Sequence, residues 1–139
     1  MVNIKYSILI PTFNKCEYLN YTLKSILENS FKNFEVIISN DHSSDGTEEF
    51  LKEIKDPRVK LVKPPVKLTQ TKNYEYLLSF AKGEWISILG DDDGVLPNFF
   101  PTLDKLTKKY NNFDILKFKR AIYYWEQVSD LYGDRVIFF

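Results

Sequence analysis

Short apolar runs alternate with segments of helical periodicity along most of this chain. The runs that we predict as strands are Tyr6–Pro11, Phe34–Ser39, Arg58–Val62, Glu84–Leu89 and Asp114–Phe118. The first run is almost continuously apolar, as is typical of strands that are buried on both faces of a parallel sheet, and the apolar part of the run Glu84–Leu89 also predicts a buried strand. Strands that alternate with helices favour an α/β fold, with an open, mostly parallel sheet and helices on both of its faces.

The segments between these runs predict helices from the spacing of their apolar side chains. The first helix extends from Glu17 to about Ser30, and a short second helix follows Thr47. The third extends from about Lys72 to Ala81 with Gly83 as its cap, and Pro97 lies near the first turn of the fourth. Their apolar faces consist of Leu19, Leu23, Ile26, Leu27, Phe50, Leu51, Ile54, Leu77, Leu78, Ala81, Phe99, Phe100, Leu103 and Leu106.

Length and composition indicate one globular domain, residues 1–139. Hydrophobic residues make up 44% of the chain and aromatic residues 16%, which is sufficient for a packed core. The formal net charge is zero, so we expect no general attraction to nucleic acid or to an acidic membrane. Cys16 is the single cysteine, which fits a reducing, cytoplasmic compartment, and no apolar run is long enough to span a membrane.

Three polar segments follow predicted strands at their carboxyl ends. These segments are Thr12–Asn14, Asn40–Thr47 and Asp91–Asp93. In a parallel sheet such ends meet at one edge, and open α/β sheets bind their ligands at that edge. The sequence therefore predicts a binding site at the carboxyl edge of the sheet.

The most acidic of these segments consists of Asp91, Asp92 and Asp93, between Gly90 and Gly94. Three adjacent carboxylates repel one another, which favours a bound cation. Mn²⁺ and Mg²⁺ prefer oxygen ligands, and Mg²⁺ sites often combine one or two carboxylates with substrate phosphates. The alternative is an acidic, solvated turn before a helix. The two other polar loops at the same edge favour the metal site.

Several common α/β functions lack their motif in this sequence. The first strand is not followed by Gly-x-Gly-x-x-Gly, and the chain contains neither Gly-x-x-x-x-Gly-Lys-Ser/Thr nor Gly-x-Ser-x-Gly. The first strand also ends without a carboxylate, which disfavours a phosphatase with an aspartate nucleophile at that position. A dinucleotide site of the usual kind, a P-loop and a nucleophile elbow are therefore disfavoured.

Three segments carry a resemblance to a known family: SILIPTFNKCEYLNYTLKSIL from Ser7, VIISNDHSSDGT from Val36 and AKGEWISILGDDDGVLP from Ala81. In this order they resemble the N-terminal, nucleotide-binding half of a family-two glycosyltransferase with the Rossmann-like GT-A fold. The resemblance implies transfer of a sugar from a nucleoside diphosphate to a glycan or lipid-linked acceptor, usually with inversion and with Mn²⁺ or Mg²⁺. It also implies bacterial cell-surface polysaccharide synthesis, in the cytoplasm or at the inner face of the membrane.

The resemblance assigns expected roles to the residues around the nucleoside. Pro11, Thr12, Phe13 and Asn14 match the segment that lies against the nucleoside. Asp41 matches the aspartate that reads the base. A carboxylate can accept a hydrogen bond from the ring N–H of uracil, thymine or guanine. A UDP-sugar is therefore our first choice of donor, with dTDP- and GDP-sugars as alternatives.

The acidic turn matches the family's Asp-x-Asp motif in its last two residues. By this match Asp91 lies near the ribose and Asp92 binds the metal ion, with Asp93 as a further ligand. Gly90 replaces the first aspartate of the motif. A divalent ion at this position would stabilise the negative charge that the leaving diphosphate gains as the glycosidic bond breaks.

The start of the third helix carries two further candidates. Asn73 matches an asparagine of some family members, and Lys72 beside it is expected to meet a phosphate or a base oxygen. Glu75 departs from the asparagine that is more often found there.

An inverting transferase also needs a general base, which in this family lies well after the acidic turn. We expect it beyond Phe139, because Glu126, Asp130 and Asp134 match no family motif. We therefore expect a C-terminally truncated piece that binds donor and metal but transfers little or no sugar alone. The strand-like run Arg135–Phe139 also predicts a homodimer, formed through the edge of that strand.

Two other classes stay open at this point. A sugar-nucleotide pyrophosphorylase needs a glycine-rich loop in the place of Pro11–Asn14. A non-catalytic nucleotide-sugar-binding module would keep Asp41 and Asp92 but lack the base.

Other polar and aromatic residues have simpler explanations than ligand binding. We expect His42 to be a solvated turn residue and Cys16 to be a packing residue. Asp45–Thr47 predicts a turn and the start of a helix, and the cluster Tyr123–Trp125 predicts strand packing.

Overall fold

The computed structural model describes residues 4–110, 112, 114, 115, 121, 122, 137 and 138. The chain divides into two compact units, Met1–Lys105 and Leu106–Phe139. In the second unit, β5 (Ala121–Ile122) and β6 (Ile137–Phe138) form an antiparallel pair. The prediction of one domain over residues 1–139 stays a prediction, and each unit is considered by itself.

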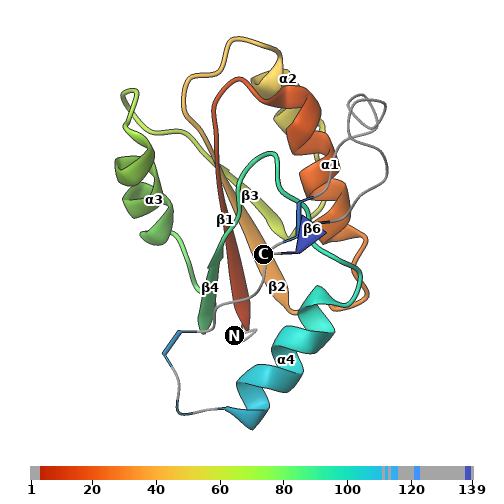
Figure 1. Cartoon of the computed structure of the whole chain (residues 1–139). Coiled ribbons are helices and arrows are strands. Elements are labelled where there is room, and N and C mark those ends of the chain that lie inside the picture. The colour runs from red at the N-terminus through yellow and green to blue at the C-terminus, as the bar shows by residue number, and fades with distance from the viewer. Residues whose placement is uncertain (1–3, 111, 113, 116–120, 123–136, 139) are drawn as a thin grey trace. The chain divides into compact units, whose positions relative to one another are not determined.

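The first unit has the predicted alternation of strands and helices (Figure 1). The elements are β1 (Tyr6–Thr12), α1 (Cys16–Leu27), β2 (Phe34–Asn40), α2 (Thr47–Glu53), β3 (Val59–Val62), α3 (Gln70–Leu78), β4 (Trp85–Ile88) and α4 (Phe99–Lys109), the last of which continues into the second unit. The predicted α/β class is therefore confirmed. None of the helices among the described residues is long and apolar enough to cross a bilayer.

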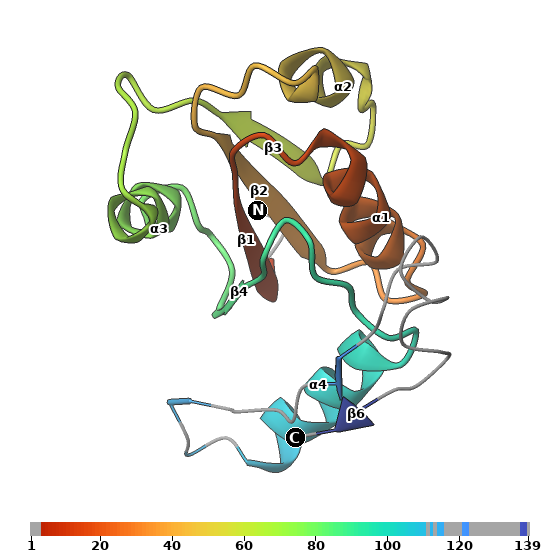
Figure 2. The ribbon, with the colours of Figure 1, turned by 45° about the horizontal axis from the view of Figure 1, so that its top comes forward.

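The strands of the first unit form one parallel sheet in the order β3-β2-β1-β4. The chain adds β2 and β3 on one side of β1 and β4 on the other, so the strand order reverses between β1 and β4. Helices α1 and α2 lie on one side of the sheet and α3 on the other (Figures 1 and 2). β1 and β2 are buried along almost their whole length, which explains their continuous apolar sequence.

Aromatic packing fixes the amino ends of the two central strands. The ring of Phe100 stacks on Phe34, with 4.6 Å between ring centroids, and also contacts the ring of Tyr6. Tyr6 and Phe34 are the first residues of β1 and β2, and both are buried. This cluster holds the sheet at the end opposite the predicted site and leaves the carboxyl edge open to polar loops.

Two sequence predictions about burial are wrong. The run before the acidic turn was predicted to be a buried strand, but Ile86 and Ile88 of β4 are 48% and 50% exposed. The reason is that β4 pairs only with β1 among the described strands, so it is an outer strand of this sheet. On α3, Leu77 is fully buried as predicted, whereas Leu78 is 42% exposed, since only one face of the helix meets the sheet.

The prediction that Gly83 caps the third helix is also wrong. α3 begins after its N-cap Thr69 and ends at Leu78, several residues before the glycine. A Cβ atom on Gly83 would lie 2.5 Å from the backbone nitrogen of Ser7 and 2.7 Å from the carbonyl carbon of Tyr6. Glycine is needed there because two backbone segments approach each other closely.

The remaining predictions concern the end of the chain. Asp114 and Ile115 do not form the start of a strand. The rest of that predicted run, 116–118, lies outside the described residues, as do the aromatic cluster 123–125 and the carboxylates Glu126, Asp130 and Asp134.

Candidate functional site

The sheet register brings the three polar loops together at one edge. Thr12, the last residue of β1, is paired with Asn40, the last residue of β2. The next residue, Asp41, donates its N–H to the Thr12 carbonyl at 2.9 Å. On the other side, the Thr12 hydroxyl donates to a carboxylate oxygen of Asp91 at 2.8 Å. Thr12 therefore joins Asp41 to Asp91, and the prediction that these loops share an edge is confirmed.

Asp91 is held on two sides. Its carboxylate accepts the bond from Thr12, and its carbonyl accepts a bond from the Thr22 hydroxyl of α1 at 3.0 Å. Burial raises the pKa of the Asp91 carboxyl above its ordinary value and the charge of Asp92 adds to this, although the Thr12 hydroxyl acts in the opposite direction. Asp91 is thus a positioned, half-buried carboxyl group rather than a freely solvated one.

The neighbouring carboxylates turn to different partners. Asp92 forms an ion pair with the Lys15 ammonium at 3.4 Å, and its side chain is half exposed. Asp93 accepts the N–H of Gly90 at 3.1 Å and so closes its own turn. A Cβ on Gly90 would lie 2.7 Å from an Asp93 oxygen and 3.1 Å from an Asp92 oxygen. A side chain at position 90 would therefore crowd Asp92 and Asp93. This explains why the turn contains glycine at the position where the family motif often has aspartate.

This arrangement suits a cation that completes its ligand set from a bound molecule. Among the described residues, no three His, Cys, Asp or Glu side chains are grouped to hold a metal ion. Asp92 nevertheless offers an exposed, hard carboxylate oxygen at a polar edge. Mg²⁺ sites of this type use one or two carboxylates and take further oxygens from phosphates. The residues fit such a site, and Mn²⁺ or Mg²⁺ stays a prediction.

Asp41 and Phe13 are both contacted by the loop between β3 and α3. Asp41 is buried, and its two carboxylate oxygens accept the N–H of Leu68 at 3.0 and 3.3 Å. The ring of Phe13 is 42% exposed, and the Lys67 ammonium lies 3.6 Å from its centroid. Lys67 and Leu68 were not predicted as site residues, because nothing in the local sequence marks them as neighbours of Phe13 and Asp41.

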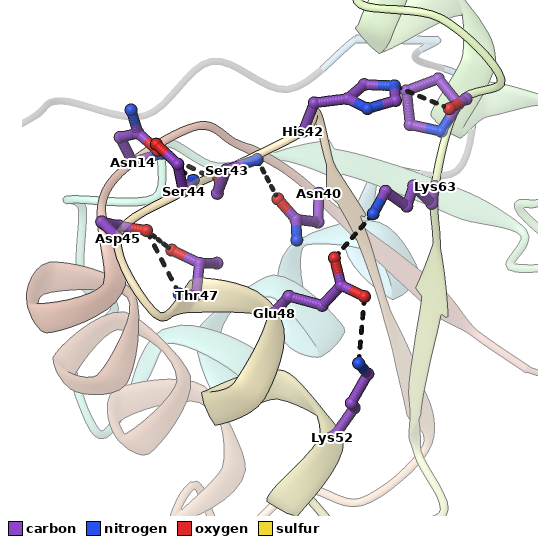
Figure 3. Close-up of polar contacts among 11 residues, drawn as sticks. Asn14, Asn40, His42, Ser43, Ser44, Asp45, Thr47, Glu48, Lys52 and Lys63 are labelled. Carbon is purple, nitrogen blue, oxygen red and sulfur yellow. Dashed lines mark hydrogen bonds and ion pairs between the residues drawn. The ribbon is translucent and has the colours of Figure 1, made fainter.

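Asn14 supports the loop that follows β2 (Figure 3). Its backbone has a φ of 53°, which asparagine tolerates better than most residues. The Asn14 amide oxygen accepts the N–H of Ser44 at 2.8 Å, and its own N–H donates to the Ser43 hydroxyl at 3.0 Å. Asn14 belongs to the segment predicted to lie against the nucleoside, and its side chain is bonded to a neighbouring loop.

Residues of the same loop behave as the simpler explanations predict. His42 is exposed, and its Nε2 lies 3.1 Å from the carbonyl of Pro64 (Figure 3). Gly46, at a φ of 89°, precedes α2, and Asp45 accepts the N–H of Thr47 at 3.2 Å. The prediction of a turn and a helix start at Asp45–Thr47 is therefore confirmed.

Three other candidate residues have no side-chain hydrogen bond to Thr12, Asp41 or Asp91 among the described contacts. Pro11 lies in β1 opposite Ser39. Lys72 is exposed in the first turn of α3. Asn73 beside it is 97% buried, and its side-chain oxygen has no hydrogen-bond partner among the described residues. Nucleotide contacts by Pro11, Lys72 and Asn73 stay predictions.

A polar row on α1, which was not predicted, also contacts the acidic turn and the segment after it. Thr22 donates to the Asp91 carbonyl, Ser25 accepts the N–H of Val95 at 3.1 Å, and Asn29, just after the helix, donates to the Pro97 carbonyl at 3.1 Å. Thr22 and Ser25 are three residues apart and lie on one side of the helix, and Asn29 continues this row just beyond the helix end. The spacing of these polar residues, next to the apolar face of the helix, could have predicted from the sequence that this side of α1 contacts a polar segment.

A parallel sheet with helices on both faces, and with its polar loops gathered at the carboxyl edge, is an open α/β domain of the class that binds ligands at that edge. Residues 7–135 match the model of the family described as "Glycosyl transferase family 2". The chain belongs to this family.

Curated relatives agree with the family. The chain is 35% identical over 102 residues to the GalNAc(5)-diNAcBac-PP-undecaprenol beta-1,3-glucosyltransferase of Campylobacter jejuni. The aligned region covers 71% of this chain and 33% of that relative. It is 30% identical over 117 residues to the UDP-Glc:alpha-D-GlcNAc-diphosphoundecaprenol beta-1,3-glucosyltransferase WfaP of Escherichia coli. Here the aligned region covers 80% of this chain and 47% of that relative. The chain thus spans one third to one half of the length of these relatives.

Solved structures show the same fold at low sequence identity. Residues 1–349 of S. aureus TarS match with a TM-score of 0.73 and 20% identity, over 84% of this chain and 40% of that one. The mannosyltransferase PcManGT of Pyrobaculum calidifontis matches with a TM-score of 0.68 and 18% identity, over 94% of this chain and 38% of that one. The Rossmann-like GT-A expectation for the fold is confirmed.

Proposed function

We propose that this chain is the donor-binding part of an inverting glycosyltransferase that takes its sugar from a nucleoside diphosphate, with a UDP-sugar as the preferred donor. The observation that carries the proposal is the connection made by Thr12, which is bonded to both Asp41 and Asp91. The carboxyl end of β1 thereby connects Asp41, the residue proposed to bind the nucleobase, with Asp91, the residue proposed to bind the ribose. Asp92, the candidate for the ion, directly follows Asp91.

Each of these residues has a distinct task in donor binding. Asp41 accepts a base N–H, and the exposed ring of Phe13 offers a surface on which the base stacks. Asp91, held by Thr12, accepts a ribose hydroxyl. Asp92 holds Mn²⁺ or Mg²⁺ against the diphosphate. When bound, this ion stabilises the negative charge of the leaving diphosphate.

Lys15 reduces the negative charge of the acidic turn in the ligand-free chain. Bare carboxylates would repel a diphosphate, and the Lys15 ammonium partly offsets the charge of Asp92. The pair is long and exposed on both sides, so it is weak and easily exchanged for a divalent ion.

The names of relatives support the choice of donor and acceptor. Two curated relatives are named for glucosyl transfer to undecaprenol-linked diphosphate acceptors, and one name includes UDP-Glc. TarS was solved with UDP and with UDP-GlcNAc, and PcManGT with GDP-Man and Mn²⁺. We therefore propose a glycan or lipid-linked acceptor, at the cytoplasmic face of a bacterial membrane. The general base expected beyond Phe139 and the expected homodimer both stay predictions.

Calorimetry with UDP, dTDP, GDP and CDP, each with and without Mn²⁺, tests this function. We expect UDP to bind only weakly without the ion and much more tightly with it, and CDP to bind at least about tenfold more weakly than UDP, because cytosine has no ring N–H for Asp41. Asp92→Asn should abolish the ion-dependent part of the binding. Glu53→Gln, which removes an exposed carboxylate of α2, is the charge-matched control and should change nothing. Binding that ignores both Mn²⁺ and Asp92→Asn would contradict the proposal.

A further inference from the structure

The loop between β3 and α3 is anchored along its length. The Lys63 carbonyl accepts a bond from the Tyr76 hydroxyl at 3.0 Å, and the Pro64 carbonyl lies 3.1 Å from His42 Nε2. At the other end, the N–H of Leu68 donates to Asp41. The segment between these anchors carries Lys67 and is therefore held close to the carboxyl edge of the sheet.

Lys67 covers one face of the Phe13 ring. Its ammonium is 3.6 Å from the centroid of the Phe13 ring. Stacked aromatic groups pack with their carbon atoms about 3.5 to 4.0 Å apart. An ammonium and a base cannot both occupy that position over one face of the ring. The contact is a cation–π interaction at an exposed ring, which is weak enough for a ligand to replace.

We propose, on the basis of the function proposed above, that Lys67 occupies the base position on Phe13 in the ligand-free chain and that a nucleoside binds by displacing it. Lys67 then lowers the affinity for every base to a similar extent. The choice among bases belongs to Asp41. The Leu68 bond fixes the orientation of this carboxylate and leaves acceptor positions free for a base N–H.

The decisive measurement is titration with uridine and with cytidine, followed by NMR. Nucleosides carry no diphosphate, so the attraction between Lys67 and phosphate does not enter. Lys67→Ala should bind uridine about 2- to 5-fold more tightly, which corresponds to the loss of one exposed cation–π contact. The ratio of uridine to cytidine affinity should be the same as in the wild type, because Asp41 is intact.

The chain offers a matched control for this substitution. The Lys60 ammonium lies 4.6 Å from the ring of Phe80, so Lys60→Ala also removes one charge and one lysine–phenylalanine contact. It should leave uridine binding unchanged. Phe13→Leu should weaken uridine binding by at least about fivefold through the loss of stacking, and Lys67→Ala should then have no further effect in that background.

A second readout is independent of affinity. The Lys67 methylene protons beside the ammonium should be shifted upfield in the ligand-free chain by the Phe13 ring, and uridine should reverse this shift. If the wild type binds UDP but Lys67→Ala binds uridine equally or more weakly, the displacement is wrong and the proposed function stands. If the wild type binds neither uridine nor UDP with Mg²⁺, the proposed function fails, and the displacement with it.

Discussion

At the scale of single residues, Asp45 shows how a carboxylate near the site can serve the fold alone. Its two oxygens accept the N–H of Cys16 at 2.9 Å and the N–H of Thr47 at 3.2 Å. These are the first residues of α1 and α2. Asp45 therefore satisfies free donors at the starts of two helices that lie on the same side of the sheet (Figure 1), and Figure 3 shows its contact with Thr47.

We expect Asp45→Ala to lower the free energy of unfolding by about 1–2 kcal/mol, because the carboxylate of Asp45 bonds the first N–H of α1 and of α2 as a capping side chain does, although the N-cap residues are Lys15 and Gly46. Burial raises the pKa of Asp45, but the bonds from Cys16 and Thr47 outweigh it and place the pKa below its ordinary value. A lowered pKa in the folded state stabilises the fold above the unfolded pKa of about 3.9 and loses this effect as the pH falls through the folded pKa. The difference between variant and wild type should thus shrink in acid.

Urea denaturation at pH 7 and at pH 3 measures this difference. Asp45→Asn is the matched control, because its amide oxygen still accepts a bond but carries no charge. It should cost less than the alanine substitution and should show no acid-dependent change of its own. An equal cost of Asp45→Ala at both pH values would exclude the proposed contribution of the charge.

The sequence located some residues of the site and not others, for a physical reason. Asp41 and Asp91 directly follow strands, so the parallel order alone places them at one edge. No local sequence pattern distinguishes Lys15 and Lys67 from other lysines on the surface. Their partners, Asp92 and Phe13, come from other parts of the chain, and only the packed loops bring each pair together.

At the scale of elements, local periodicity predicted strands and helices well because burial of a strand or a helix face is a local pattern. The errors concern position in the sheet. Whether Ile86 and Ile88 are covered depends on which strands pair with β4, and the need for Gly83 depends on its approach to Ser7. Neither is a property of the segment that contains these residues.

Helix α1 has a second task besides covering the sheet, since it holds the acidic turn through Thr22 and Ser25. Thr22→Val keeps the shape of this fully buried side chain but removes the donor to the Asp91 carbonyl. An unsatisfied buried acceptor costs about 1–3 kcal/mol. We expect a loss of stability of that size, and weaker binding of UDP with Mn²⁺, because the turn that carries Asp92 is less well fixed.

The serine variant separates packing from the hydrogen bond. Thr22→Ser loses a methyl group, which also lowers stability by about 1 kcal/mol, but it retains the hydroxyl. Its binding of UDP with Mn²⁺, measured by calorimetry, should therefore equal that of the wild type. Equal binding by Thr22→Val would show that α1 does not position the acidic turn.

At the scale of the whole molecule, the contacts of the three carboxylates relate metal binding to nucleotide binding. Asp91 is bonded to Thr12, Asp92 is paired with Lys15, and Asp93 closes its own turn. A cation alone therefore finds two exposed carboxylates in the acidic turn, one paired with Lys15 and the other bonded to the N–H of Gly90. A diphosphate that arrives alone meets net negative charge. Each ligand supplies what the other lacks, so the two should bind together rather than in sequence.

Thermal unfolding with each ligand alone and with both tests this coupling. Mn²⁺ alone and UDP alone should change the melting temperature little, whereas both together, at about 100 times the dissociation constant, should add about 2.7 kcal/mol to the free energy of unfolding. Coupling is reciprocal, so UDP must strengthen Mn²⁺ binding by the same factor by which Mn²⁺ strengthens UDP binding. Asp92→Asn should remove this factor and leave the weak effect of UDP alone unchanged. Tight binding of Mn²⁺ in the absence of nucleotide would mean that the acidic turn forms a complete metal site by itself, and the coupling would then be wrong.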